Sequence, residues 1–262
     1  MAVIRNLGAR MNSVLNMPFM LFCVVFLLLA LSAQTGAFLQ NVLGELRSHN
    51  REEFGFVLTA TLTLLGLIIG FAFSMSISRY DQRKTYEEEE ANAIGTEYLR
   101  CDLLPDSDAV GVRALLAQYL HQRILFYEIH DANRLGPINV QMTLLQEQMW
   151  SVVQRAAVSR PVATLSLVAS GMNDVFNSRG YTEAAWLNRI PVEAWALMAT
   201  IAVFCNFLLG YGTKQRRSLL LLVLPLVIAV AFFLIAEIDS PRGGLIRVQA
   251  IDLLSLAHSL GT

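Results

Sequence analysis

Long apolar runs alternate with charged segments along the chain. Four stretches contain no Asp, Glu, Lys or Arg, and they cover about 18–42, 54–78, 194–213 and 218–236. A helix that crosses the hydrocarbon core of a bilayer needs about 20 such residues. Only the short basic segment Lys214–Arg217 separates the last two stretches, as in a helical hairpin. The pattern predicts four transmembrane helices arranged in two pairs.

The first stretch has a second interpretation. Arg5 and Arg10 precede an apolar run that ends near the small residues Ala30 and Ser32, as in a secretory signal with its cleavage site. A transmembrane helix is favoured because the amino-terminal region is long and uncharged sequence continues past this site. Cleavage would leave three spans.

The segment 79–193, between the second and third spans, is long enough for a helical layer outside the membrane. Helix-start signals and apolar periodicity predict helices beginning after Pro105, over about Ile138–Ser159, and over the short stretch Val162–Phe176. Leu135, Gly136 and Pro137 are expected to separate the first two. Because no alternating strand pattern is evident, the sequence predicts an all-α membrane protein forming a single domain over 1–262.

The second span continues into charged sequence without a helix breaker. Nothing between Phe71 and Ala93 interrupts the helix, so the span is expected to become the stem of the helical layer. Arg79, Arg83 and Lys84 fall where lipid headgroups or a pore mouth would lie. Glu87 to Glu90 follow, and Arg83–Glu87 and Lys84–Glu88 are spaced for pairing on a solvated helix surface.

Two stripes follow four-residue steps along the second span. One consists of the small residues Gly66, Gly70, Ser74 and Ser78, which permit close helix packing. The other consists of Thr63, Leu67 and Phe71, which would pack in the bundle or line a pore. Periodicity alone favours two packing faces over a pore.

Composition and charge narrow the function classes. The chain is 55% hydrophobic and carries 20 basic against 21 acidic residues, so it is neither an ordinary soluble domain nor a basic nucleic-acid-binding protein. Cys23, Cys101 and Cys205 have no metal-ligand spacing. Because no nucleophile elbow or phosphate-binding loop is present, the sequence predicts no enzyme activity, cofactor or metal.

The distribution of basic residues predicts the orientation. Eight lie near the membrane on the amino-terminal side, against five on the other: Arg5, Arg10, Arg79, Arg83, Lys84, Arg189, Arg242 and Arg247, against Arg47, Arg51, Lys214, Arg216 and Arg217. The positive-inside rule therefore favours cytoplasmic termini and a cytoplasmic helical layer in a multi-pass plasma-membrane protein, as in a bacterial inner membrane.

Two segments, LLGLIIGFAFSMSISRYDQRKTYEEEEANAIGTEYLR and IAEIDSPRGGLIRV, resemble the bestrophin anion channels, and more closely the bestrophin-like family of bacterial and plant proteins. The resemblance implies a homopentamer in a lipid membrane whose second spans surround a pore for small anions such as chloride. It also implies that Thr63, Leu67 and Phe71 form the narrow neck, although Thr63 departs from the apolar pattern.

The segment after the fourth span departs from the family pattern. Bestrophins place a calcium clasp there, and this chain keeps Asp239, Pro241 and Gly243 but has Arg242 and Gly244 where carboxylates are needed. No calcium site is therefore expected, and Asp239, Pro241, Arg242 and Gly243 are expected to shape the exit from the membrane. The alternative function is a non-conducting membrane protein whose cytoplasmic helices bind a protein partner or anionic lipid.

Overall fold

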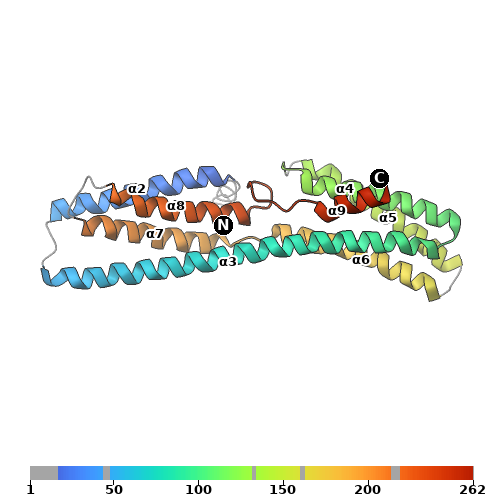
Figure 1. Ribbon diagram of the computed structural model, residues 1–262, viewed down its shortest axis with the longest axis horizontal. Helices are drawn as coiled ribbons and strands as arrows, with labels where there is room; N and C mark the ends of the chain where they lie inside the picture. Colours follow the sequence, from blue (N-terminus) through green and yellow to red (C-terminus); the bar gives the residue numbers. More distant parts are fainter. Residues whose placement is uncertain (1–16, 44–47, 132–133, 160–162, 214–218, 262) are drawn as a thin grey trace, which may run out of the picture. The chain divides into compact units, whose positions relative to one another are not determined.

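The computed structural model describes residues 17–43, 48–131, 134–159, 163–213 and 219–261, and no strand occurs in these ranges. The all-α prediction is therefore confirmed (Figure 1). The α-helices are α2 (Pro18–Leu43), α3 (Ser48–Arg100), α4 (Asp106–Glu128), α5 (Leu135–Ser159), α6 (Ala163–Leu187), α7 (Val192–Gly212), α8 (Leu220–Asp239) and α9 (Ile251–Leu260), with a 3₁₀ turn, η1, at Cys101–Leu103.

The chain divides into two compact units. The first unit comprises Met1–Ser78 and Arg189–Ile246, and the second comprises Arg79–Asn188 and Arg247–Thr262. Helix α3 belongs to both, because its 53 residues continue without interruption from Ser48 to Arg100. The predicted unbroken helix from the second span into the charged stem is therefore confirmed.

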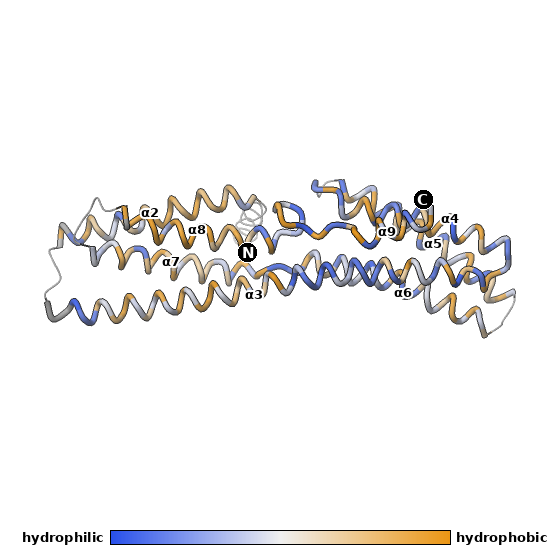
Figure 2. Tube along the Cα trace, viewed as in Figure 1, coloured by the Kyte–Doolittle hydropathy of each residue, from blue (hydrophilic) through white to orange (hydrophobic). Residues whose placement is uncertain are grey.

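The long apolar stretches lie wholly or partly in the first unit. Within the described residues, four stretches are long and apolar enough to cross a membrane: Pro18–Gln40, Arg51–Leu103, Ala163–Gly212 and Leu221–Asp239. Figure 2 shows apolar positions along α2, α7, α8 and the first half of α3. Leu29, Met198, Cys205, Ala229 and Ile235 are among the fully buried side chains of its core. Burial of such side chains drives the association of these helices within the unit.

Close contact between α2 and α7 depends on two glycines. A Cβ atom on Gly36 would lie 2.1 Å from the carbonyl oxygen of Phe207, and one on Gly210 would lie 1.9 Å from that of Ala33. Any side chain at either position would overlap the backbone of the facing helix. The hydroxyl of Ser32 donates to the carbonyl of Val203 at 2.8 Å, so small and polar residues share this contact.

The second unit packs α4, α5, α6, α9 and the second half of α3 around an apolar core that includes Ile94, Val112, Leu116, Met149 and Val168. Two sequence-based boundaries differ from the structure. Helix α6 continues to Leu187 instead of ending at Phe176, because Thr182 and Trp186 lie in the buried face of its last turns. Helix α5 begins at Leu135, since Pro137 is accommodated in its first turn. Helix α9 lies outside the helices that the sequence pattern predicts.

Candidate functional site

In the first unit, α3 presents one face to the chain's own helices and leaves the other open. Leu65, Ala72 and Ser76 are buried, with exposed fractions of 2%, 7% and 0%. Both predicted stripes lie on exposed positions of the same helix. Only 11% of the most apolar part of α3 is buried within the chain, compared with 50% of the most apolar part of α8. This face of α3 is therefore available for lipid or for another copy of the chain.

The three predicted neck residues share the exposed face. Leu67 is 55% exposed and Phe71 is 64% exposed. Thr63 is also exposed, and its hydroxyl donates to the carbonyl of Thr59 at 2.9 Å. The hydroxyl proton of Thr63 is thus used inside the helix, which lowers the polarity that this position offers to its surroundings.

The small-residue stripe has no close neighbour within the described chain. A Cβ atom on Gly66 or Gly70 would meet nothing within 4 Å. Ser74 and Ser78 are exposed as well. The packing role predicted for this stripe therefore has no partner among the described residues of the same subunit, and it stays a prediction about an assembly.

The charged stem, which is the α3 segment from Arg79 to Arg100, differs from the prediction of a solvated surface. Arg83 is 1% exposed within the subunit, whereas Arg79 is half-buried and Lys84 is exposed. Their place at a pore mouth or lipid headgroup stays a prediction. Glu87 and Glu90 are also buried, at 1% and 0% exposed. These three side chains lie at three- and four-residue steps on the stripe of α3 that faces the core of the second unit.

The burial of these charged side chains was not predicted, although the helical periodicity of α3 contains a signal for it. Ile94 and Cys101 continue the same helical stripe, and both are fully buried. Two apolar positions in register with Glu87 and Glu90 indicate which face of the stem points inward. Glu88 and Glu89 lie off this stripe and are exposed.

Glu90 forms the centre of a buried ionic network with Arg123 of α4. The Arg123 guanidinium donates to both carboxylate oxygens, with Nη2 2.9 Å from Oε2. Tyr127 and Thr182 donate their hydroxyls to Oε2 at 3.4 and 3.3 Å. The guanidinium also lies 4.5 Å from the centre of the Phe126 ring. Both charges are therefore paired and hydrogen-bonded, as buried ions require.

Glu97 lies two turns beyond Glu90 on the same stripe of α3, and its buried carboxyl has fewer polar partners than that of Glu90. Its side chain is fully buried, and neither carboxyl oxygen has a hydrogen-bond partner within the described chain. The nearest cation is Arg100, whose Nη1 lies 3.8 Å from Oε2. Burial raises the pKa of Glu97 to about 8, although Arg100 opposes the shift. This carboxyl is therefore largely protonated at neutral pH.

The predicted membrane-exit motif connects α8 with the start of α7. The backbone N–H of Ile190 donates to both carboxylate oxygens of Asp239, at 3.1 and 3.2 Å. Asp239 is the last residue of α8, and Pro241 after it is buried. The hydroxyl of Ser240 accepts from the N–H of Gly243 at 3.2 Å, which closes the turn beyond the helix. Arg242 is half-buried.

A second glycine in this turn meets a carboxylate. The side chain of Glu237 accepts the backbone N–H of Leu245, and a Cβ atom on Gly244 would lie 2.5 Å from the Glu237 carbonyl oxygen. The close approach requires glycine at position 244. Among the described residues, no group of three His, Cys, Asp or Glu side chains is arranged to hold a metal ion.

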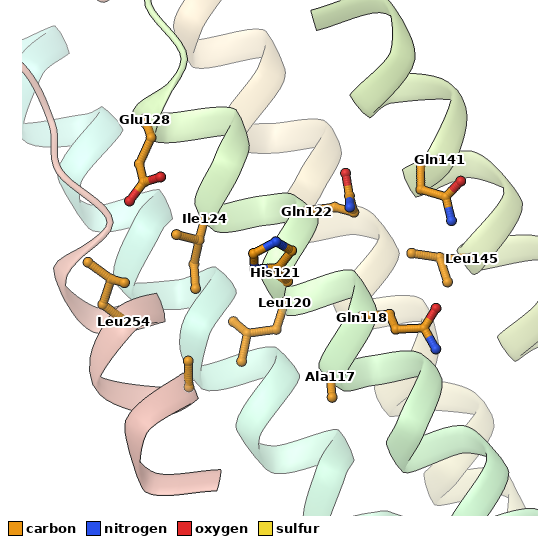
Figure 3. A pocket seen from close by; sticks show the side chains of 11 residues that line it. Ala117, Gln118, Leu120, His121, Gln122, Ile124, Glu128, Gln141, Leu145 and Leu254 are labelled. Atoms are coloured by element: carbon orange, nitrogen blue, oxygen red, sulfur yellow. The ribbon is translucent and has the colours of Figure 1, made fainter. Parts of the chain in front are cut away.

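A groove of about 570 Å³ runs along α4 in the second unit. Figure 3 shows Leu254 of α9 on one side of α4 and Gln141 and Leu145 of α5 on the other. His121 and Glu128 of α4 also contribute to its lining. The lining mixes apolar and polar groups and contains no cluster of charges that would select one class of ligand.

A family model for the bestrophin-like domain matches residues 26–253. The chain belongs to the bestrophin-like family. The resemblance found in the sequence is therefore confirmed, and this bestrophin-like chain is a membrane protein. No curated protein matches it.

Solved structures share the bestrophin-like fold. A bestrophin homologue from Klebsiella pneumoniae, phased on zinc, has a TM-score of 0.61 at 11% identity over 92% of this chain and 95% of that chain. A single-substitution variant of a bestrophin homologue from the same organism has a TM-score of 0.60 at 15% identity over 91% and 93%. At these identities the likeness establishes the fold alone.

Proposed function

We propose that this bestrophin-like protein assembles into a homo-oligomer, as a pentamer, and forms an ion channel lined by α3. Small anions such as chloride are the proposed permeant ions, as the family implies. The proposal depends on one observation: the face of α3 that carries Leu67 and Phe71 is exposed and not covered by α2, α7 or α8. Apolar rings of this kind restrict ion passage by excluding water.

In a ring of α3 helices, the exposed face of each α3 would contact the neighbouring copies and line the central pore. The small stripe at Gly66 and Gly70 allows close approach of a neighbouring helix, and the exposed Leu67 and Phe71 side chains would then converge on the axis. In a lone subunit the small stripe would have no neighbouring helix to contact. Leu67 and Phe71 would then pack against acyl chains, which are as apolar as these side chains.

The first experiment measures chloride flux from liposomes containing the purified protein, whose assembly size is determined beforehand in detergent. Phe71→Ala is expected to raise flux several-fold, since the aromatic ring would be the main obstruction at its level. Phe204→Ala on α7 is the matched control, because Phe204 is similarly exposed at 60% and lies on another helix. Equal flux in the two variants would contradict the assigned neck.

The assembly size tests the alternative function. A monomer or dimer would lack a central pore enclosed by α3 helices, and it would support a non-conducting protein that binds a partner or anionic lipid through its helical layer. A pentamer with no measurable flux for any ion would also contradict the channel.

One observation favours small cations as a second candidate for the permeant ion. In the charged stem, Asp81, Glu88 and Glu89 are exposed, whereas Lys84 is the one exposed basic residue and Arg79 and Arg100 are half-buried. Several copies of this surface around an axis would create a negative field at that level and attract cations. The sign of the reversal potential in a salt gradient distinguishes the two candidates.

A further inference from the structure

Helix α9 is held against α3 by a buried acidic side chain. The Oε1 atom of Glu87 accepts the backbone N–H groups of Asp252 and Leu253, each at 3.0 Å. These two donors belong to the first turn of α9, where a helix has no internal acceptors for them. Glu87 is only 1% exposed, so water does not replace this contact while α9 is docked.

Two carboxyl groups meet at this point. The backbone N–H of Asp252 lies 3.0 Å from Glu87 Oε1, and the Asp252 carboxyl is near enough to raise the pKa of Glu87. Two ionised carboxylates are both acceptors, so a hydrogen bond between these two side chains would require a proton. Full ionisation of the pair would leave only repulsion, at a place where Glu87 is buried.

The rest of the docking is apolar and small. Leu253 is fully buried, Ala257 is 9% exposed, and Leu256 packs against α3 where Gly95 leaves room. Helix α9 has 10 residues, which is too short for a stable isolated helix in water. Its folding therefore depends on contacts with α3 and α4, and the loss of one strong contact has a large effect.

We propose that α9 is a proton-dependent latch, closed when Glu87 and Asp252 share a proton and loosened when both carboxyl groups are ionised. The latch lies within the second unit and follows the last membrane helix by a connection of residues 240–250. It does not depend on whether the protein conducts ions.

The direction of the pH dependence follows from the docked state. Burial, and also the neighbouring Asp252 carboxyl, raise the pKa of Glu87 from 4.5 to about 7, against the opposing effect of the Leu253 N–H. A raised pKa means that the docked form binds the proton more tightly. The stabilisation is therefore complete below about pH 4.5 and is lost as the pH rises through about 7.

Other ionisable groups near the latch do not account for a loss of stabilisation in this pH range. Tyr127 of α4 faces Glu87, but burial raises the pKa of its hydroxyl well above the usual value, so it stays neutral. On α3 itself, Arg83 keeps its charge in this range, and Glu90 is paired with Arg123. His121 in the groove beside α9, and His258 on α9, are exposed and require control variants.

The test measures hydrogen–deuterium exchange of the full-length protein between pH 5 and 8.5, corrected for the intrinsic rate at each pH. Protection of the α9 amides is expected to fall by more than about tenfold, because the rise in the pKa of Glu87 from 4.5 to about 7 exceeds the one unit that corresponds to a factor of ten. Amides in the middle of α5 should keep their protection, which excludes general unfolding. Constant protection of α9 across this range would overturn the proposal.

Variants identify the group that titrates. Glu87→Gln keeps an acceptor for both N–H groups but cannot ionise, so its α9 protection should not change with pH. Glu88→Gln, an exposed neighbour, is the matched control and should behave like the unmodified protein. Asp252→Asn removes the partner charge and should move the transition to lower pH.

The histidine variants complete the test. His121→Gln and His258→Gln should each retain the pH-dependent fall. If either of them abolishes it, or if Asp252→Asn leaves the midpoint unchanged, the acidic pair is not the latch. The Asp252→Asn result decides the matter even if Glu87→Gln does not fold.

Discussion

Glu90 and Arg123 form an ion pair in the second unit in which both side chains are 0% exposed. Moving two ions out of water costs several kcal/mol for each, and their attraction offsets this cost only with good geometry and additional hydrogen bonds. Tyr127 and Thr182 supply such bonds to Glu90. The network is therefore sensitive to the removal of either partner, since the remaining charge would have no exposed surface.

Arg123→Met is expected to destabilise the protein by about 3–5 kcal/mol, because Glu90 would be buried without its cation. The double variant Glu90→Gln with Arg123→Met should recover part of this loss. Thermal unfolding in detergent measures both. Arg113→Met is the matched control: Arg113 pairs with Asp102, which is 70% exposed, and its loss should cost less than about 1 kcal/mol. Equal effects of the two single variants would contradict the importance of the buried network.

At the scale of elements, the glycines of the first unit fall into two kinds. Gly36 and Gly210 bring the backbones of α2 and α7 together, whereas Gly66 and Gly70 on α3 face open space in the subunit. The sequence shows the second pair as a regular stripe, but it does not mark the first pair, which lie on different helices 174 residues apart. A glycine's role therefore depends on which helix faces it.

Gly210→Ala is expected to destabilise the subunit by about 1–3 kcal/mol, because its Cβ atom would lie 1.9 Å from the carbonyl oxygen of Ala33 and force the helices apart. Gly66→Ala adds the same methyl group in open space and should leave subunit stability unchanged. Thermal unfolding of the two variants side by side provides the measurement. A similar loss in both would show that α3 packs differently from the described arrangement.

At the scale of the whole molecule, the exposed charges of the stem decide what an assembly would offer to passing ions. Glu88 and Glu89 remain at the surface, while Arg83, Glu87 and Glu90 are removed from it by the core of the second unit. The three buried charges cannot contribute to a field at a pore mouth as exposed charges would. Among the exposed charges of the stem, the acidic residues Asp81, Glu88 and Glu89 outnumber the basic residue Lys84.

Replacing both surface acids by Glu88→Gln and Glu89→Gln is expected to shift the permeability ratio several-fold towards anions, since each copy loses two negative charges. The reversal potential in a salt gradient measures this ratio, and high ionic strength should reduce the difference. Glu147→Gln, at an exposed position on α5, is the control and should leave the ratio unchanged. No shift in the double variant would mean that these side chains lie away from the ion path.

Several features of this protein depend on local chemistry and can be predicted from the order of residues alone. Long uncharged runs identify the apolar helices, and the absence of proline or a turn signal between Phe71 and Ala93 predicts the unbroken helix α3. Helical periodicity also places Leu67 and Phe71 near each other on one side of the helix. Each of these properties is set by residues within a few turns.

Which charged side chains are buried depends on contacts between helices that are distant in sequence. Arg83, Glu87 and Glu90 have the composition of a solvated surface, and their burial depends on distant partners. Arg123 lies 33 residues from Glu90, and Asp252 lies 165 residues from Glu87. Whether a charge can leave water is determined by the donors and opposite charges that the fold brings to it, so local sequence could not assign these residues to the interior.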